Sequence, residues 1–382
     1  MTKTVMEGSL ATAKAAALCK PDLVVAYPIT PQTHIVENLG KLIAQGKLKS
    51  KHIEVDSEFS ALSACVGGSA TGSRVFTATA SQGLALMNEV LFAASGMRLP
   101  IVMVVANRAL SAPINIWNDW QDSISARDSG WIQLYCETVQ EIVDTIIQAY
   151  KIAEDTQVLL PVMVCMDGFF LTHVVEVLDM PEDISKYLKK YKPEHAILDP
   201  EKPCTQGPFA FPIPYAELKK DLSDAIDSST GIIKKSHDDY AKLFNRTYGN
   251  GLIEEYKTKG KKTIIITMGS LSGNVKEVVD KRDDAGLLRI KSYRPFPKKD
   301  ILNALKGKET VIILEKNISL GTSCGALFDE IRSIHCNVKD TPKILDYIVG
   351  IGGMDCRTDD IETIINESID KKDGHIEWLM EK

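Results

Sequence analysis

The chain has 382 residues, which suits two or three domains, and 44% of them are hydrophobic, enough for sizeable cores. Its 51 acidic and 45 basic residues give a formal charge of −6, and the scattered basic residues argue against nucleic acid as the main partner. The N-terminus shows no signal-peptide pattern, and no apolar run approaches the ~20 residues that span a bilayer. We therefore expect a soluble, cytoplasmic protein that binds neither membranes nor nucleic acid.

Eight cysteines are spread along the chain, at positions 19, 65, 136, 165, 204, 324, 336 and 356. The closest pair is 12 residues apart, so the tight Cys-x-x-Cys spacing of iron–sulfur and structural zinc sites is missing. We expect reduced core thiols and no metal bound by this chain; ligation by cysteines distant in sequence is the alternative.

The first half alternates helical and strand patterns. Its strands are apolar and close together, which is typical of a parallel sheet covered on both faces. We expect strands at 23–26, 53–55, 75–78, 100–106 and 160–166, and helices at 3–20, 31–46, from 58 onward, 84–94 and 139–154.

The pattern changes between residues 180 and 260. Seven prolines interrupt 181–215, and a charged helical stretch follows from 217 to about 256, which predicts a long excursion ending in a helical linker. A second doubly wound parallel sheet is then expected, with strands at 263–268, 287–292, 310–314 and a closing strand at 344–349, and helices at 271–281, 298–305 and 326–333. The turn at 269–273 could hold a phosphate, but it lacks the dinucleotide spacing, and we favour a plain helix start.

Polar residues follow the predicted strands of the first half. Two prolines flank Ile29 and Thr30 just after the first strand, so the Thr30 hydroxyl lies at a rigid corner where parallel α/β domains bind ligands. Pro31 opening the next helix is the alternative. Glu58 follows the second strand and precedes a run of small residues, which suits either a functional carboxylate or an ordinary helix cap.

The third and fourth strands end in similar fashion. Ser81, Gln82 and Gly83 form a small, polar turn typical of ligand-binding loops. Arg108 ends the fourth strand, where its guanidinium suits a carboxylate or phosphate; a structural salt bridge to Asp119 or Asp122 competes with this interpretation.

Two further stretches carry chemically distinctive residues. Trp117 and Trp120 fall in the polar loop 111–130, which we expect to line a site rather than fill a core. Asp167-Gly168 after the fifth strand indicates a turn, and His173 by itself indicates a structural histidine rather than a ligand.

Read together, these strand ends resemble one family in order and spacing. They are similar to those of the alpha subunits of 2-oxoacid:ferredoxin oxidoreductases, and most of all the pyruvate:ferredoxin oxidoreductase kind. The residues that carry this resemblance are Tyr27 to Thr33, Ser57-Glu58, Ala80 to Gly83, Asn107-Arg108, Asp119 to Asp122, and Asp167 to Phe169 with His173. The resemblance covers essentially the whole chain. It implies a pyrimidine-binding thiamine diphosphate domain at 1–250, including the excursion at 180–260, and a transketolase C-terminal-like domain at 260–382.

The resemblance also implies residue roles. Glu58 matches the glutamate that contacts N1′ of the aminopyrimidine, where a carboxyl group favours the tautomer that removes the C2 proton. Thr30 and Arg108 match the residues that bind the substrate's carboxylate and oxygen atoms. At position 120 this chain has tryptophan, where the single-chain relatives typically have histidine. The matched cofactor-binding residues are Tyr27, Pro28, Ile29, Glu58, Ser81, Gln82 and Gly83.

The family's diphosphate motif, Gly-Asp-Gly with a later asparagine, is missing from this sequence, as are cluster cysteines. The resemblance therefore implies half of an active site, completed by a beta subunit that holds the diphosphate, magnesium and [4Fe-4S] clusters, with gamma and delta subunits passing electrons to ferredoxin. Pyruvate and coenzyme A are the implied substrates. The alternatives are a sibling enzyme for 2-oxoisovalerate, 2-oxoglutarate or oxalate, and a non-catalytic α/β adaptor, which would need neither Glu58 nor Arg108.

Overall fold

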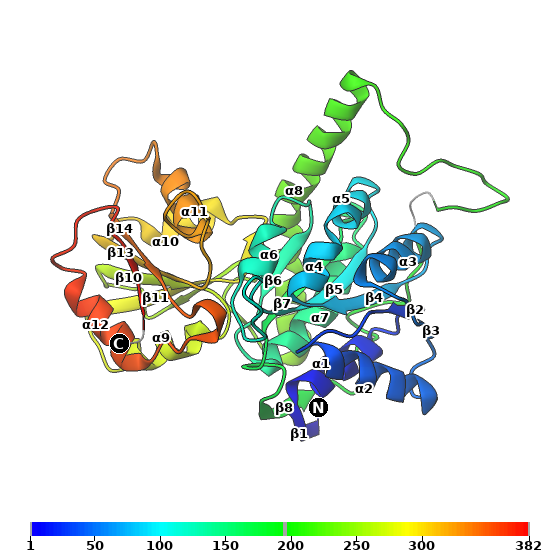
Figure 1. Cartoon of the computed structure of the whole chain (residues 1–382), viewed down its shortest axis with the longest axis horizontal. Coiled ribbons are helices and arrows are strands. Elements are labelled where there is room, and N and C mark those ends of the chain that lie inside the picture. Colours follow the sequence, from blue (N-terminus) through cyan, green and yellow to red (C-terminus); the bar gives the residue numbers. More distant parts are fainter. Residues whose placement is uncertain (1, 194–196, 381–382) are drawn as a thin grey trace.

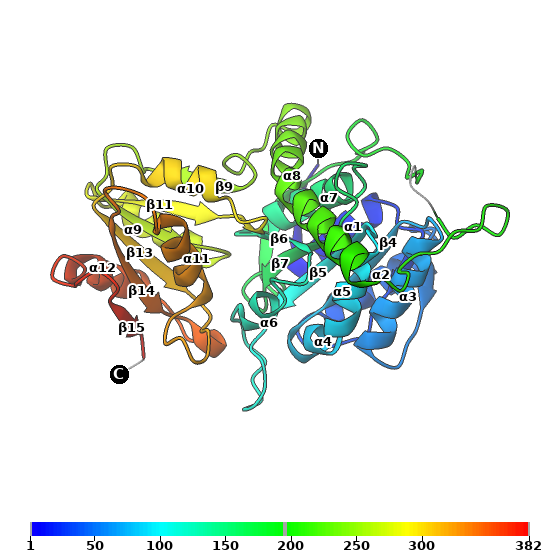
Figure 2. The ribbon, with the colours of Figure 1, turned by 90° about the horizontal axis from the view of Figure 1, so that it is seen from above.

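The computed structural model describes residues 2–193 and 197–380 and shows two lobes, each built around a mainly parallel sheet (Figure 1). The predicted α/β class is confirmed. Viewed from above, the larger N-terminal lobe and the smaller C-terminal lobe lie side by side (Figure 2). None of the helices within the described ranges is long and apolar enough to cross a membrane.

The first sheet has seven strands in the order β12-β6-β7-β5-β4-β2-β3, parallel except for β12. Its strands are β2 (Leu23–Val25), β3 (Lys51–Ile53), β4 (Val75–Thr79), β5 (Ile101–Asn107), β6 (Ile132–Tyr135), β7 (Val162–Asp167) and β12 (Ser292–Arg294). The accompanying helices are α1 (Gly8–Leu18), α2 (Thr33–Ala44), α3 (Glu58–Ala70), α4 (Ser81–Leu86), α5 (Asn88–Gly96), α6 (Gln121–Ser125), α7 (Val139–Ala153) and α8 (Pro212–Phe244).

The helices divide between the two faces of this sheet. The core that includes α2 also holds α1 and α7, whereas α3, α4 and α5 belong to the core on the opposite face. The strand order reverses beside β2, because β3 lies on one side of it and β4 on the other. In open α/β sheets such a switch point opens a crevice at the carboxyl ends of the strands.

The second sheet has the order β15-β14-β13-β10-β11-β9, parallel except for β9. Its strands are β9 (Ile253–Tyr256), β10 (Thr263–Thr267), β11 (Ala285–Ile290), β13 (Thr310–Glu315), β14 (Lys343–Ile348) and β15 (Ile376–Trp378). Its helices are α9 (Leu271–Asp280), α10 (Lys298–Leu305), α11 (Ala326–His335), the short 3-10 helix η1 (Ile351–Gly353) and α12 (Thr358–Glu367).

The start of the chain differs from the predicted helix at 3–20. Residues Thr2–Glu7 form β1, which pairs antiparallel with β8 (Val175–Met180), and the helix begins only at Gly8. A Cβ at Gly8 would stand 1.7 Å from the Leu171 carbonyl oxygen, so glycine permits this contact between backbones. Local alanine content could not reveal a strand whose partner lies far along the chain.

Other predicted elements also need correction. The second strand lies at 51–53 rather than 53–55, and β6 and α12 were not predicted. The helix expected to reach about 256 ends at Phe244, because Asn245 adopts a left-handed conformation with φ 53°, and Ile253–Tyr256 is a strand. The strand predicted at 344–349 is β14, but it does not close the second sheet, because β15 follows it and forms the edge.

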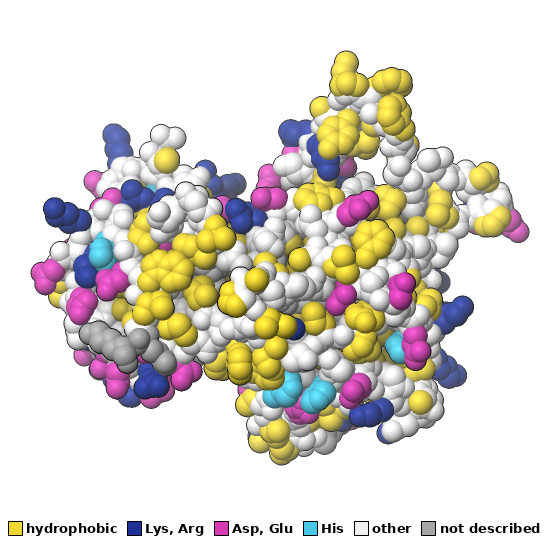
Figure 3. Space-filling view, in the orientation of Figure 1, with side chains coloured by type: hydrophobic (Ala, Val, Ile, Leu, Met, Phe, Trp, Pro, Cys, Tyr) yellow, Lys and Arg dark blue, Asp and Glu magenta, His cyan; other side chains and the backbone are white. Residues whose placement is uncertain are grey.

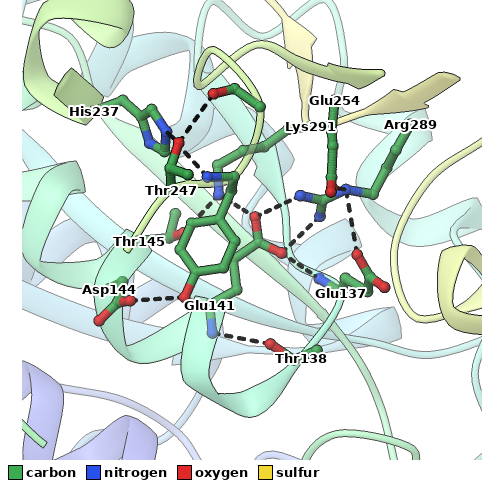
Figure 4. Close-up of polar contacts among 12 residues, drawn as sticks. Glu137, Thr138, Glu141, Asp144, Thr145, His237, Thr247, Glu254, Arg289 and Lys291 are labelled. Atoms are coloured by element: carbon green, nitrogen blue, oxygen red, sulfur yellow. Dashed lines mark hydrogen bonds and ion pairs between the residues drawn. The ribbon is translucent and has the colours of Figure 1, made fainter. Parts of the chain in front are cut away.

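The two lobes share a buried ionic cluster (Figure 4). Glu141 of α7 accepts hydrogen bonds from Arg289 at 2.6 and 3.0 Å and from Lys291 at 2.5 Å, and all three side chains are almost completely buried. In addition, β12 lies within the C-terminal half of the sequence but pairs with β6 of the first sheet. These contacts fix the carboxyl edges of the two sheets relative to each other.

Candidate functional site

The candidate site lies at the switch point, where the loops after β2 and β4 leave the first sheet in opposite directions. Gln32 joins the loop after β2 to strand β4 from a fully buried position. Its Oε1 accepts a hydrogen bond from the Ile29 amide at 3.3 Å, and its Nε2 donates to the Ala78 carbonyl at 2.7 Å. Tyr27 and Ile29 are half-buried, and Pro28 and Thr30 are exposed, so this loop forms one rim of the crevice.

Glu58 is the first residue of α3, as predicted. Ser57 caps the helix by accepting a hydrogen bond from the Ser60 amide at 3.2 Å, so Glu58 is not needed as the cap. The Glu58 side chain is only 7% exposed and lies against Gly83, where a Cβ would stand 2.6 Å from Glu58 Oε1. Among the described residues, the Glu58 carboxylate has no hydrogen-bond partner within the chain.

The Ser81 turn is held in a strained conformation beside Glu58. Ser81 has φ 48°, and its hydroxyl donates to the Ala109 carbonyl at 2.5 Å. Gln82 donates more weakly, at 3.4 Å, to the Ser111 carbonyl. The turn is therefore tied to the loop that follows β5.

Arg108 lies at the end of β5 and contacts the Thr30 loop. Its Nη1 donates to the Thr30 carbonyl at 2.9 Å and its Nε to the Asn115 carbonyl at 2.8 Å. Burial lowers the pKa of Arg108, and the nearby charge of Asp122 opposes this effect. Within the described parts of the chain, no carboxylate forms a salt bridge with the guanidinium, and neither Nη2 nor the Thr30 hydroxyl has a partner.

Asp122 connects the separate strand ends, a role that the sequence did not reveal. Its Oδ2 accepts from the amides of Ser81 and Arg108 at 2.9 and 3.0 Å, and its Oδ1 accepts from Asn107 Nδ2 at 2.8 Å and the Ser123 amide at 2.7 Å. Burial raises the pKa of Asp122, although these hydrogen bonds oppose the shift. Asp122 therefore fixes the Ser81 turn relative to Arg108 through their backbones and does not pair with the guanidinium.

The C-terminal lobe contacts the loops at the carboxyl ends of the first sheet's strands. Lys316 follows β13, is 5% exposed, and lies 2.9 Å from Asn118 Oδ1 and 3.3 Å from Asp167 Oδ2. Asp167 also accepts from the Ser270 amide at 3.0 Å, so the turn considered for phosphate already has a carboxylate partner. Burial raises the pKa of Asp119, which accepts from the Gly352 amide at 3.1 Å, to about 7.

The expectation that the loop tryptophans line a site rather than fill a core is wrong for Trp120, and for Trp117 it stays a prediction. Trp117 is 53% exposed, whereas Trp120 is completely buried and donates from Nε1 to Asp167 Oδ1 at 2.8 Å. Trp120 also packs edge-on against Tyr135. Trp120 therefore belongs to the core and does not line the crevice.

Comparisons with known proteins agree with this architecture. Residues 14–238 match the family model described as "Pyruvate flavodoxin/ferredoxin oxidoreductase, thiamine diP-bdg", and residues 262–361 match "Pyruvate:ferredoxin oxidoreductase core domain II". A solved structure of 2-oxoglutarate:ferredoxin oxidoreductase from Magnetococcus marinus aligns with a TM-score of 0.75 at 20% identity, over 96% of this chain and 65% of that chain. This last likeness concerns the fold.

Curated relatives match along nearly their whole length. The chain is 53% identical to pyruvate synthase subunit PorA of Methanocaldococcus jannaschii, over 98% of this chain and 97% of the relative. It is 48% identical to the protein of the same name from Pyrococcus horikoshii (99% and 98% covered) and 39% identical to ketoisovalerate oxidoreductase subunit VorA of that organism (98% and 97% covered). With these matches and the shared architecture, the chain belongs to the pyruvate flavodoxin/ferredoxin oxidoreductase family of enzymes.

Proposed function

We propose that this chain is the alpha subunit of a multi-subunit pyruvate:ferredoxin oxidoreductase. The reaction is the thiamine-dependent oxidative decarboxylation of pyruvate to acetyl-CoA and carbon dioxide, with reduction of ferredoxin. The observation that carries the proposal is the buried Glu58 carboxylate, which faces Gly83 without a hydrogen-bond partner among the described residues. The Glu58 oxygens are not fully enclosed, so a ligand can reach them and complete their hydrogen bonding.

The residues around Glu58 fit the pyrimidine half of thiamine diphosphate. Gly83 leaves the space beside the carboxylate free of a side chain, and the buried Thr79 hydroxyl next to it has no partner among the described residues. When bound, the cofactor supplies a carbon nucleophile for the 2-keto carbon of the substrate. Glu58 holds a proton at N1′ of the pyrimidine, while the rim residues Tyr27, Pro28, Ile29, Ser81, Gln82 and Gly83 position the ring.

Arg108 and Thr30 orient the substrate in this proposal. The free Arg108 Nη2 and the Thr30 hydroxyl are both hydrogen-bond donors, and the bond from Arg108 Nη1 to the Thr30 carbonyl holds the two residues together. Two donors in this arrangement suit the carboxylate of a 2-oxoacid. Lys316, a second cation near this edge, is buried against Asp167, so a dicarboxylic substrate gains no free positive charge from it.

The remaining parts of the active site are assigned to other subunits. The sequence lacks the diphosphate-binding motif, so a beta subunit holds the diphosphate, magnesium and [4Fe-4S] clusters, and gamma and delta subunits pass electrons to ferredoxin. In this chain the pyrimidine-binding domain covers residues 1–250 and the transketolase C-terminal-like domain 260–382. The assembled enzyme acts in the cytoplasm.

A second candidate is a sibling enzyme with another 2-oxoacid as substrate, favoured by the 39% identity to a ketoisovalerate oxidoreductase subunit. The test is to co-express the chain with its partner subunits and to compare kcat/KM for pyruvate, 2-oxoisovalerate, 2-oxoglutarate and oxalate, with coenzyme A and ferredoxin present. We expect pyruvate to have the highest value. A higher value for 2-oxoisovalerate would establish the sibling, and no turnover with any 2-oxoacid would leave the adaptor role. The isolated chain should be colourless and inactive.

A further inference from the structure

Three side chains with metal-binding atoms meet outside the candidate active site. Glu7 ends β1, His34 lies in the first turn of α2, and His173 lies between β7 and β8. One ligand atom from each can be chosen so that all three atoms lie within 4.8 Å of one another. Among the described residues, this is the one group of three or more such side chains that is close enough to share an ion.

The fold holds these three segments together through the backbone. The amides of Gly8 and Ser9, directly after Glu7, donate to the carbonyls of Val174 and Thr172 at 3.0 and 2.8 Å. The position of Glu7 relative to His173 is therefore set by hydrogen bonds that directly follow Glu7 and flank His173. A site whose ligands are positioned in advance loses little conformational entropy when it binds an ion.

The side chains themselves are also oriented. His34 Nδ1 lies 3.0 Å from Glu7 Oε1, and the rings of His34 and His173 are 5.0 Å apart. The His173 ring stacks on Phe169 at 4.9 Å, and its Nδ1 lies 2.7 Å from the Thr172 hydroxyl. Contacts of this kind, from residues that do not touch the ion, fix the ring orientation of metal-binding histidines.

The geometry suits a small divalent ion of intermediate softness. Zinc binds imidazole nitrogen and carboxylate oxygen at about 2.0–2.2 Å, which places two ligands of a tetrahedral ion roughly 3.4 Å apart. The 3.0 Å separation of His34 and Glu7 needs only slight widening to accept an ion in place of their hydrogen bond. The side chains of His34 and Glu7 are 48% and 32% exposed, so an ion can enter and water can complete its coordination.

A metal-free hydrogen-bonded cluster is the simpler explanation for one histidine–glutamate pair. It does not explain the second imidazole, whose ring lies 5.0 Å from that of His34 although, among the described residues, no hydrogen bond joins it to His34 or Glu7. Figure 3 shows histidine and acidic side chains gathered on the open surface of the N-terminal lobe.

We propose that Glu7, His34 and His173 form a binding site for one divalent transition-metal ion of the zinc class, with water in the remaining coordination position. The bound ion links β1, α2 and the segment between β7 and β8, three parts of the chain that are otherwise joined by hydrogen bonds and packing. It therefore stabilises the folded N-terminal lobe and takes no part in the proposed reaction at Glu58.

The test uses the full-length, tag-free chain after treatment with a chelator. Cys204→Ser and Cys336→Ser are introduced throughout, because both cysteines are exposed and their thiols bind zinc. Zinc affinity is measured by competition with a chromogenic indicator, and coordination is followed by the d–d absorption of Co²⁺. We expect one equivalent of zinc, a Co²⁺ spectrum of low coordination number, and a higher Tm in the presence of zinc.

Glu7→Gln, His34→Gln and His173→Gln should each weaken zinc binding at least ~10-fold and abolish the Co²⁺ spectrum, since even residues that only support a ligand are worth about this much. His52→Gln is the matched control, because His52 lies in β3 outside the cluster. Far-ultraviolet circular dichroism checks the fold of each variant. Zinc binding that is unchanged in all three variants, or no binding of zinc by the parent chain, would overturn the proposal.

Discussion

Gly83 and Glu58 lie so close that a Cβ at position 83 would stand 2.6 Å from Glu58 Oε1 and 2.8 Å from its Cγ. Glu58 begins α3 and Gly83 lies in α4, after different strands, and each was singled out separately from the sequence. Because of this contact, the Glu58 carboxylate can occupy its position only if residue 83 has no side chain.

Gly83→Ala tests this contact directly. The added methyl group must displace the Glu58 carboxylate, and a displacement of about 1 Å at a reacting centre costs on the order of 100-fold in rate. We expect such a loss in kcat of the assembled enzyme without loss of assembly. Gly67→Ala is the control, because Gly67 lies in α3 with no atom within 4 Å of an added Cβ. Equal activity of the two variants would contradict the proposed contact.

Glu58→Gln should leave the fold intact and remove most turnover. The amide is nearly the same size as the carboxylic acid but cannot exchange a proton with N1′, and acid–base groups in such positions contribute about 10²- to 10⁴-fold. Pre-steady-state and steady-state rates of the complex provide the measurement. Glu89→Gln, at an exposed position in the first turn of α5, should retain normal rates. A folded Glu58→Gln complex with near-normal turnover would refute the assigned role.

Arg108→Ala should weaken selection for the substrate carboxylate. Loss of one partner of a partly buried, charge-assisted pair costs about 2 kcal/mol in kcat/KM, expressed mainly as a higher KM for pyruvate. Arg332→Ala removes a guanidinium that pairs with Asp373 on the surface, at 40% exposure, and serves as the control. An unchanged KM for pyruvate in Arg108→Ala would assign carboxylate binding to another residue.

Glu141→Gln should destabilise the contact between the lobes. Burial by itself raises the pKa of Glu141, but Arg289 and Lys291 outweigh it and the pKa is lowered, so the carboxylate is charged at neutral pH. Removing this charge leaves Lys291 buried without a carboxylate partner and Arg289 with only Glu254 and Glu137, at a cost of about 3–5 kcal/mol in the free energy of unfolding. Urea denaturation measures the loss. Glu277→Gln, in an exposed pair with Lys281, should change stability by less than about 0.5 kcal/mol.

His237 makes stability depend on pH in the weakly acidic range. Burial, followed by the charge of Lys291, lowers its pKa to about 4, whereas the unfolded chain takes up the proton near pH 6.5. The contribution of neutral His237 to the free energy of unfolding is therefore complete above pH 6.5 and is lost as pH falls toward 4. The loss is about 2 kcal/mol between pH 7 and pH 5.

The measurement compares urea unfolding of the parent chain and His237→Gln at both pH values. Glutamine can still accept the hydrogen bond that the Tyr248 amide donates to His237 Nε2 at 3.1 Å, but it does not titrate. Between pH 7 and pH 5 the free energy of unfolding of the parent chain should thus fall by about 2 kcal/mol more than that of His237→Gln. A constant difference would show that His237 binds no additional proton on unfolding.

The sequence by itself determined the α/β class, most strand ends and the place of Glu58 at a helix start. These features depend on local patterns: apolar strands, helical periodicity and the polar residues that follow each strand. The preference for a plain helix start over a phosphate site at 269–273 came from the same local signals, and the Ser270 amide donates to Asp167.

Only the tertiary structure decided how distant segments meet. Asp122 connects Ser81 with Arg108, Trp120 turns into the core, and β1 pairs with β8, although none of these contacts leaves a local periodic signal. The same holds for Glu7, His34 and His173, which come together because backbone hydrogen bonds close long loops of chain. Long-range pairing depends on the packing of the whole fold, and a residue's neighbours in sequence carry no record of it.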